Sequence, residues 1–320
     1  MKCFDPNEYV HAVAVSDEDR QFLKTRVAEA LRDYPGATQL LNAIAEAIGA
    51  PVEPATGEDG DDWKHIKVDL PIVDACNLAC RACSHFSPLV RKVEPRDVAD
   101  IAAALTLLQN VAPGLTYSVF IMGGEPLLHP QVADIVDVVA DCMPNAERFL
   151  VTNLMGWAKH RDVLVPKLLS SNTFLAYTKY GKLNAGQIAQ VEAESKASGL
   201  WISCFGNDAE TFCTYPKSIT GRYGRSGKAK CPMAKCPSLI GNRLYLCSPV
   251  ASLEYPNDAF NLSLKCSKFD YIDLRNVEHP HEILALMYLP NPFCSHCNVG
   301  ANEQFPWVSG KRAREEWFED

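Results

Sequence analysis

The sequence predicts an α/β fold: a partial barrel of parallel strands, with a helical extension before it and a small cysteine-rich domain after it. Strand-like apolar runs alternate with helical patterns between residues 65 and 215. Polar or glycine-rich segments follow the strand-like runs, as at the mouth of a barrel. The alternation stops after residue 215, where cysteines gather. We therefore expect three units, at residues 1–64, 65–215 and 216–320.

The composition is that of an ordinary globular protein, with 320 residues, 47% hydrophobic and 22% charged. The first residues lack the apolar core of a signal peptide, and no apolar run is long enough to span a membrane. We expect a cytoplasmic protein with reduced thiols and no membrane partner. Its thirteen cysteines favour metal ligation over a disulfide framework. A net charge of −8 argues against broad non-specific binding to nucleic acid.

Two helices are predicted in the first unit. Ser16 to Asp19 can cap a helix that runs to Tyr34 and stops at Pro35-Gly36. A second helix, from Thr38 to Ile48, has apolar residues at helical spacing and ends at Gly49. Residues 51–62 form a proline- and acid-rich linker. We interpret the unit as a packing extension that covers one end of the barrel; a substrate-recruiting module is the alternative.

The middle unit alternates five strands with four helices. The predicted strands are Ile66–Val73, Tyr117–Met122, Arg148–Thr152, Thr173–Thr178 and Leu200–Cys204. The predicted helices are Asp97–Gln109, Val132–Cys142, Val163–Leu169 and Ala185–Ser198. Such alternation gives a parallel sheet, and its chemistry lies at the carboxyl ends of the strands.

Three thiols follow the first strand within eight residues: Cys76, Cys80 and Cys83, in a C-x3-C-x2-C pattern. A cubane iron–sulfur cluster normally takes four cysteine ligands, so three leave one iron open. An open position is typical of a catalytic metal. The alternative is a structural zinc site with His85 as its fourth ligand.

This spacing after a strand resembles the radical S-adenosylmethionine (radical SAM) superfamily, and the resemblance covers roughly residues 65–300. It implies a partial (β/α)6 TIM-like barrel and a [4Fe-4S] cluster on Cys76, Cys80 and Cys83. It also implies S-adenosylmethionine as cosubstrate, with its methionine moiety on the open iron. One electron at a strongly negative potential then yields a 5′-deoxyadenosyl radical.

The resemblance also implies a binding site for the cosubstrate. The family usually has an aromatic residue before the third cysteine, where this chain has Ala82, so we expect His85 or Phe86 to lie against the adenine. The glycine-rich turn about forty residues later matches the family's second landmark, which binds the methionine ammonium. Its residues are Gly123, Gly124, Glu125 and Pro126. Candidates for the ribose and carboxylate are Thr152, Asn153, Thr178 and Lys179, each of which also fits a helix cap or a solvated loop.

The last unit resembles the auxiliary-cluster extensions called SPASM or twitch domains. It has a cysteine–glycine–cysteine hairpin outline at residues 236–247 and a later C-x2-C. We expect one auxiliary [4Fe-4S] cluster. Its favoured ligands are Cys231 or Cys236, then Cys247, Cys294 and Cys297, and Cys266 is a sixth candidate. A zinc ribbon on the same positions is the alternative. The other thiols are interpreted as buried small hydrophobes: Cys3, Cys142, Cys204 and Cys213. A hydrogen-atom donor is the alternative for Cys204.

A run of basic residues at 217–235 contains no acid and is able to grip a phosphate. Its members are Lys217, Arg222, Arg225, Lys228, Lys230 and Lys235. A solvated loop is the alternative. We expect Trp307, Trp317 and Phe318 to be packing residues, and residues 312–320 to form a short amphipathic helix.

These features predict a radical SAM enzyme that abstracts a hydrogen atom from an unactivated C–H bond. A flavodoxin or ferredoxin would supply the electron. The basic run favours a nucleotide, sugar or nucleic-acid base as substrate. Alternatives are a peptide-modifying maturase and, from a different class, a non-enzymatic zinc or iron–sulfur binding module. The sequence does not specify the reaction that follows abstraction.

Overall fold

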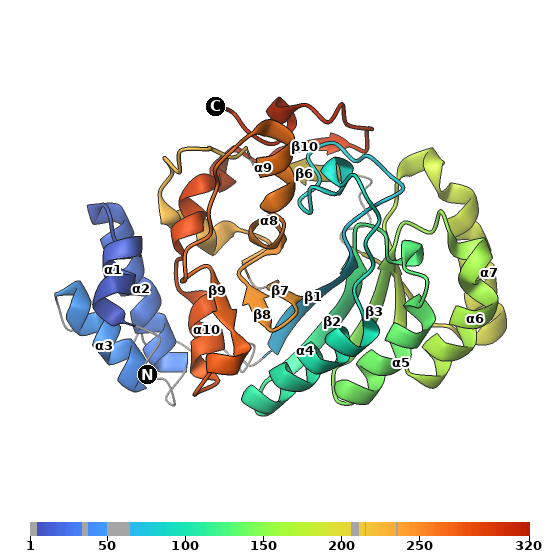
Figure 1. Cartoon of the computed structure of the whole chain (residues 1–320), viewed down its shortest axis with the longest axis horizontal. Coiled ribbons are helices and arrows are strands. Elements are labelled where there is room, and N and C mark those ends of the chain that lie inside the picture. The colour runs from blue at the N-terminus through green and yellow to red at the C-terminus, as the bar shows by residue number, and fades with distance from the viewer. Residues whose placement is uncertain (1–4, 34–37, 50–64, 206–210, 215, 235) are drawn as a thin grey trace.

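An eight-stranded sheet forms the centre of the computed structural model, which describes residues 5–33, 38–49, 65–205, 211–214, 216–234 and 236–320 (Figure 1). The strand order is β5-β4-β3-β2-β1-β7-β8-β9. The bounds are β1 (His65–Val73), β2 (Thr116–Gly123), β3 (Glu147–Thr152), β4 (Phe174–Tyr177), β5 (Ile202–Cys204), β7 (Ser238–Ile240), β8 (Arg243–Tyr245) and β9 (Tyr271–Asp273).

Strands β1 to β5 are parallel, with Val68 opposite Val119 and Phe149 opposite Phe174. Four helices connect or follow them and stand in a row along one side of the sheet (Figure 1): α4 (Val98–Val111), α5 (Val132–Cys142), α6 (Trp157–Ser170) and α7 (Ala185–Ser198). The predicted α/β class is confirmed. The sixth parallel strand is β7, which lies beside β1. By contrast β6 (Thr211–Thr214) leaves the sheet and pairs antiparallel with β10 (Glu303–Pro306).

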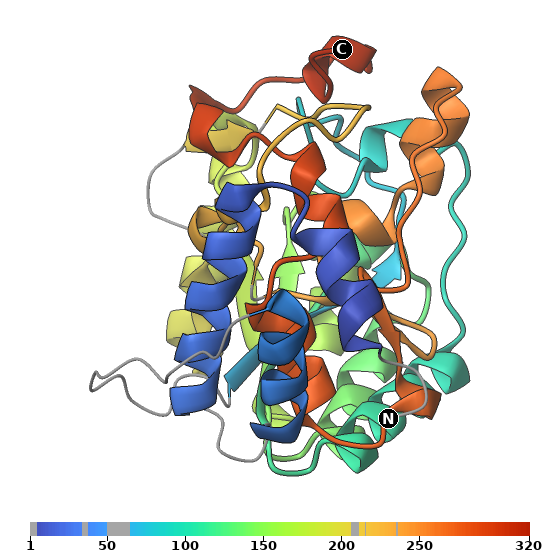
Figure 2. The same cartoon turned by 90° about the vertical axis from the view of Figure 1, so that its left-hand side faces the viewer.

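Three helices form the amino-terminal unit: α1 (Pro6–Val13), α2 (Asp17–Asp33) and α3 (Thr38–Ile48) (Figure 2). Helices α2 and α3 were predicted. Helix α1 was not, although Asp5 caps it by accepting hydrogen bonds from the backbone N–H groups of Asn7 and Glu8. The Tyr9 hydroxyl donates to the Pro290 carbonyl at 2.7 Å, so this unit packs on the carboxyl-terminal part. The predicted stop at 35–36 and linker at 51–62 lie outside the described residues.

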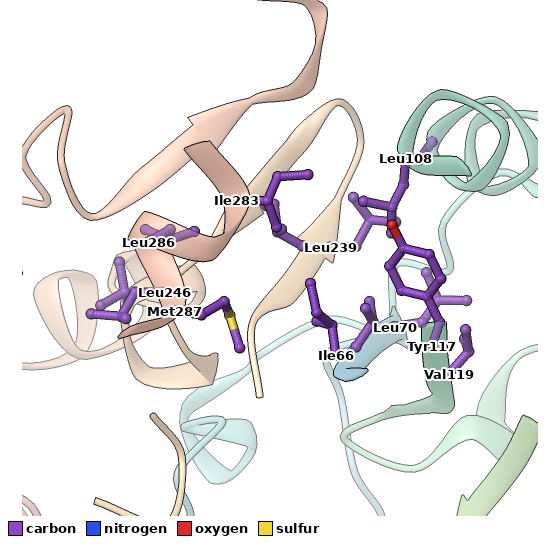
Figure 3. Packing of buried hydrophobic residues seen from close by; sticks show 14 of the residues in the cluster. Ile66, Leu70, Leu108, Tyr117, Val119, Leu239, Leu246, Ile283, Leu286 and Met287 are labelled. Carbon is purple, nitrogen blue, oxygen red and sulfur yellow. The ribbon is translucent and has the colours of Figure 1, made fainter. Parts of the chain in front are cut away.

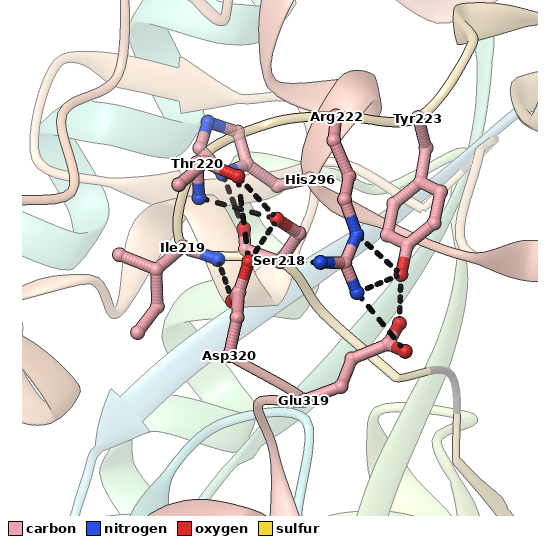
Figure 4. Close-up of polar contacts among 8 residues, drawn as sticks. All are labelled: Ser218, Ile219, Thr220, Arg222, Tyr223, His296, Glu319 and Asp320. Carbon is pink, nitrogen blue, oxygen red and sulfur yellow. Dashed lines mark hydrogen bonds and ion pairs between the residues drawn. The ribbon is translucent and has the colours of Figure 1, made fainter.

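The remaining elements follow β7 and β8: α8 (Ser248–Ala251), α9 (Glu254–Phe260), β9 and α10 (His281–Tyr288). The predicted helix at 312–320 is wrong, because only a single 3-10 turn forms, at Arg314–Glu316. The backbone N–H of Glu319 instead donates to the Lys217 carbonyl, and the Asp320 carboxylate binds the loop after Lys217 (Figure 4). These bonds hold the last residues in an extended path.

One hydrophobic core joins β1 and β2 to the carboxyl-terminal elements (Figure 3). Ile66 and Leu70 of β1 lie near Leu239 of β7 and Ile283 and Met287 of α10 (Figure 3). Each fully buried aliphatic side chain contributes roughly 1.5–3 kcal/mol. The core therefore fixes the position of β1, from whose end the cysteine loop leaves.

Candidate functional site: two cysteine groups

The cysteine loop begins at the carboxyl end of β1, and its backbone is tightly turned. The backbone N–H of Leu78 donates to the Cys76 sulfur at 3.3 Å, and that of Cys83 donates to the Cys80 carbonyl at 3.4 Å. The Cys76 thiol interacts electrostatically with those of Cys83 and Cys80. Burial raises the pKa of Cys76 to about 12 and that of Cys80 to about 11. The structure thus brings the three predicted thiols together in a shielded place.

Two side chains from elsewhere in the chain direct N–H groups at these sulfurs. The Asn153 amide reaches the Cys76 sulfur at 3.8 Å, and the Trp307 indole donates to the Cys80 sulfur at 3.2 Å. Such donors suit thiolates, which accept hydrogen bonds and carry negative charge. In the described ranges no three His, Cys, Asp or Glu side chains are grouped to hold a single metal ion. A cubane differs from such a site because each thiolate binds a different iron.

The glycine turn after β2 packs against the start of the cysteine loop. The N–H of Gly124 donates to the Val73 carbonyl at 2.8 Å, and that of Glu125 donates to the Ala75 carbonyl at 3.0 Å. A Cβ on either glycine would overlap these carbonyl oxygens, and Gly123 has a φ of +145°. Both glycines are therefore needed for the close backbone approach that positions the cysteine loop.

Glu125 is buried, with 1% exposure, and connects this turn to the end of β3. Its carboxylate accepts hydrogen bonds from the Leu127 N–H at 3.1 Å, the Thr152 hydroxyl at 2.5 Å and the Asn153 N–H at 2.8 Å. Burial raises its pKa to about 7, although these hydrogen bonds oppose the shift. Pro126 begins a 3-10 turn directly after it. The carboxylate of Glu125 thus has partners within the protein.

Asn184 extends this polar network to the end of β4, and the sequence analysis missed it. It is fully buried, and its amide donates to the Asn153 carbonyl at 3.0 Å and the Thr178 carbonyl at 2.8 Å. Its side-chain oxygen accepts from the Tyr180 N–H at 3.0 Å. Thr178 therefore contributes its backbone here, while Lys179 beside it is half-buried. The only signal in the sequence was an asparagine just before a predicted helix.

An aromatic group lies beside the thiols. The Tyr180 ring stacks on Phe212 at 5.4 Å between centroids and meets the Trp307 ring edge-on at 5.8 Å. Burial raises the pKa of Tyr180, and the nearby thiols, Cys80 foremost, add to this shift. Sequence reasoning treated Trp307 as a packing residue and did not identify its contact with a cysteine.

The two predicted adenine neighbours have different surroundings. Phe86 is fully buried, with Trp317 and Phe318 at 5.9 Å and 6.3 Å between ring centroids. Its ring is thus covered by the last residues of the chain, which are packing residues as expected. The buried Nε2 of His85 has no hydrogen-bond partner among the described residues. Burial lowers the pKa of His85 to about 4, so its ring is neutral.

A second cysteine group forms in the carboxyl-terminal part. The Cys247 thiol interacts electrostatically with those of Cys297, Cys231 and Cys294, and Cys297 also interacts with Cys231. Cys236 interacts electrostatically with Asp69 of β1, and its interaction with Cys231 is weaker than the one with Asp69. Cys266 lies apart, near Asp270 and Arg243. Of the predicted candidates, four come together: Cys231, Cys247, Cys294 and Cys297.

Two buried lysines accompany the cysteine groups. The Lys228 ammonium donates to the Leu286 carbonyl at 2.7 Å and the Asn291 side-chain oxygen at 2.5 Å, and also to the Leu289 carbonyl. Burial lowers its pKa to about 8, and thiols of the second group lie nearby. Lys217 interacts with Cys83 of the first group and with Cys231 and Cys297 of the second. One buried lysine therefore interacts with thiols of both groups.

The basic run is not a continuous exposed surface, which counts against the predicted phosphate grip. Lys217 and Lys228 are buried, and buried Arg225 pairs with Asp19 of α2 at 3.3 Å. Arg222 forms ion pairs with Glu319 at 3.4 Å and Asp320 at 3.5 Å (Figure 4). Lys230 is exposed, and Lys235 lies outside the described residues. A run of basic residues in the sequence does not indicate whether their side chains are buried. Most of the cations in this run have partners within the protein.

The remaining thiols differ from one another. The Cys142 sulfur contacts the Thr106 hydroxyl, and Cys204 is half-buried at the end of β5. Cys213 is exposed, so its interpretation as a buried hydrophobe is wrong: it lies on β6 in a two-stranded ribbon. Cys3 lies outside the described residues. Among the helices that the structure describes, none is long and apolar enough to cross a membrane.

Comparison with known proteins gives short matches. No protein-family model matches the chain. The GTP 3′,8-cyclase of Microcystis aeruginosa is 35% identical over 85 residues, 26% of this chain and 26% of the relative. That of Acaryochloris marina is 34% identical over 68 residues, 21% of this chain and 20% of the relative. The chain thus aligns with only about a quarter of the length of these curated relatives.

Solved structures give wider but weaker similarity. BtrN in complex with AdoMet and 2-DOIA has a TM-score of 0.44 at 12% identity, over 73% of this chain and 93% of that chain. Streptococcus suis SuiB bound to precursor peptide SuiA has a TM-score of 0.29 at 10% identity, over 83% of this chain and 82% of that chain. Similarities of this size do not position individual residues.

Proposed function

We propose that this chain is a radical SAM enzyme that reductively cleaves S-adenosylmethionine, a proposal that its cysteine motif and its similarity to GTP 3′,8-cyclases support. The predicted cofactors, a [4Fe-4S] cluster and S-adenosylmethionine, are those of the superfamily. One observation carries the proposal. Cys76, Cys80 and Cys83 meet at the carboxyl end of β1, where N–H donors from distant elements face two of the sulfurs.

The residues of the first group fit the cluster. They offer three thiols, N–H donors that stabilise thiolate charge, and the unpaired Nε2 of buried His85. A bound cluster supplies the electron that splits the sulfonium into methionine and a 5′-deoxyadenosyl radical. In this proposal Cys76, Cys80 and Cys83 hold the irons, and Asn153 orients Cys76 through its amide.

The neighbouring strand ends would hold the cosubstrate. The backbone of Gly123 and Gly124 is fixed beside the cysteine loop, which suits the methionine end. Glu125 acts there mainly by positioning, since its carboxylate already has three donors. His85, two residues after Cys83, offers a neutral ring nitrogen. Tyr180 and Trp307 cover the loop and limit access of water to the thiols.

For the second group we propose an auxiliary [4Fe-4S] cluster on Cys231, Cys247, Cys294 and Cys297, with Cys231 preferred to Cys236 because Cys231 interacts with both Cys247 and Cys297. Four thiolates complete such a cluster. The buried Lys228 ammonium beside them offsets part of their negative charge. A zinc site on the same four sulfurs is the alternative that the sequence left open; in the described residues the thiols are not grouped around a single ion, which counts against it, and sulfide analysis separates the two.

The substrate class rests on the relatives rather than on the basic run. Their name, GTP 3′,8-cyclase, favours a nucleotide over the peptide of the alternative prediction. The electron would come from a reduced flavodoxin or ferredoxin in the cytoplasm. The outcome after hydrogen abstraction is a separate question, which product analysis with nucleotides would answer.

The test begins with anaerobic purification and analysis of iron, sulfide and zinc. Two clusters predict about eight irons and eight sulfides per chain. Replacing Cys76, Cys80 and Cys83 by alanine should leave about four of each and abolish 5′-deoxyadenosine formation with dithionite. Cys142→Ala is the matched control and should retain both the full iron and sulfide content and 5′-deoxyadenosine formation. Zinc without sulfide, or reduced protein that does not cleave S-adenosylmethionine, would refute the proposed function.

A further inference from the structure

Residues 303–310, which we call the strap, lie across the cysteine loop. The N–H of Arg81 donates to the Val308 carbonyl at 3.1 Å, and the N–H of Gly310 donates to the Ala79 carbonyl at 2.6 Å. These bonds flank an antiparallel bridge between Cys80 and Ser309. The strap therefore adds a short strand to the loop that carries the first cysteine group.

Side chains fix the register of the strap. The Arg81 guanidinium pairs with Glu303 at 3.0 Å and lies 4.6 Å from the centroid of the Phe305 ring. Gly310 leaves no room for a side chain, because a Cβ there would be 2.7 Å from a Glu316 carboxylate oxygen and 3.0 Å from the Arg81 Cα. A shift by one residue would break these contacts together.

Trp307 is the strap residue that reaches a sulfur. Its indole N–H donates to the Cys80 sulfur at 3.2 Å, and its ring meets Tyr180 edge-on at 5.8 Å. The strap and Tyr180 thus hold the indole in one orientation. Trp317 donates a second indole N–H nearby, but to the Cys83 carbonyl oxygen, at 2.9 Å.

We propose that Trp307 is a positioning residue that raises the reduction potential of the cluster on Cys76, Cys80 and Cys83 through its hydrogen bond to Cys80. This inference rests on the proposed function. Hydrogen bonds to the sulfurs are among the factors that set cluster potentials. An added electron increases the negative charge on sulfur, so the bond is stronger in the reduced state and favours reduction.

The experiment compares Trp307→Phe with wild-type protein, both carrying their clusters, in an anaerobic redox titration followed by electron paramagnetic resonance. The signal that changes when S-adenosylmethionine is added identifies the first cluster. We expect its equilibrium constant for reduction to fall about tenfold, equivalent to about 59 mV for one electron. Trp317→Phe, which removes an indole bond to a carbonyl oxygen rather than to a sulfur, should leave the potential unchanged.

The outcomes separate the two proposals. Wild-type protein without a signal that responds to S-adenosylmethionine would refute the proposed function itself. An unchanged potential in Trp307→Phe, with iron content retained, would overturn only the role of Trp307. If Trp307→Phe loses its cluster, electron–nuclear double resonance of the reduced Trp317→Phe protein, labelled with 15N at its tryptophan indoles, decides: an indole nitrogen coupled to the cluster supports the bond, and its absence overturns it.

Discussion

Asp69 of β1 should make the stability of this protein depend on pH. It is 6% exposed and lies where β1 pairs with β7, and its carboxylate accepts a hydrogen bond from the Ser248 hydroxyl at 3.0 Å. Burial raises its pKa from 3.8 to about 7, and the single hydroxyl bond only partly opposes this. The folded protein therefore holds this proton up to about neutral pH.

Proton linkage determines whether the free energy of unfolding rises or falls with pH. Between about pH 4 and 7 the folded state binds more protons at Asp69 than the unfolded state, so the free energy of unfolding falls as pH rises. The loss from pH 5 to above the folded pKa spans about two pH units, or about 3 kcal/mol. Asp69→Asn keeps the shape and an acceptor oxygen without the charge. The variant should therefore lack this part of the pH dependence.

The assay is anaerobic denaturant unfolding of both proteins at pH 5 and pH 8.5. Relative to wild type, Asp69→Asn should gain about 3 kcal/mol on going from the lower to the higher pH. Asp141→Asn, on the exposed surface of α5, is the matched control and should behave as wild type. An Asp69→Asn difference that is equal at the two pH values would refute the reasoning.

Three further predictions concern the sites. Cys231→Ser should lower iron and sulfide by about four each, whereas Cys236→Ser should not; equal losses would contradict the assignment of ligands. Gly124→Ala should reduce cluster loading several-fold, because its Cβ would overlap the Ala75 carbonyl oxygen; normal iron content would disprove this role of the turn. Asn184→Ala should reduce the free energy of unfolding by about 2–4 kcal/mol, because its buried amide partners lose their bonds; a change below about 0.5 kcal/mol, the size expected of a surface substitution, would count against the network.

The sequence revealed the parts of the site that lie close together along the chain. Cys76, Cys80 and Cys83 are eight residues from first to last, and their position after a strand showed where they would lie. The glycine turn was identified through the family resemblance and its position at a strand end, and its role in packing against Ala75 became clear only from the structure. Strand periodicity located both motifs at strand ends.

Contacts between distant segments were not predictable in this way. Trp307 meets Cys80 across 227 residues of sequence, and Asn184 joins the ends of two strands through backbone carbonyls. No pattern marks Trp307, and Asn184 is marked only by its position just before a predicted helix. Lys217 and Lys228 read as exposed charges in the sequence and are buried in the fold, because packing between remote elements decides burial.

The position of Lys217 means that the two cysteine groups share one source of field. Its ammonium interacts with Cys83 on one side and with Cys231 and Cys297 on the other. The electrostatic energy of a negative charge on either group therefore depends on this one cation. Neutralising Lys217 should perturb the thiols of both groups at once.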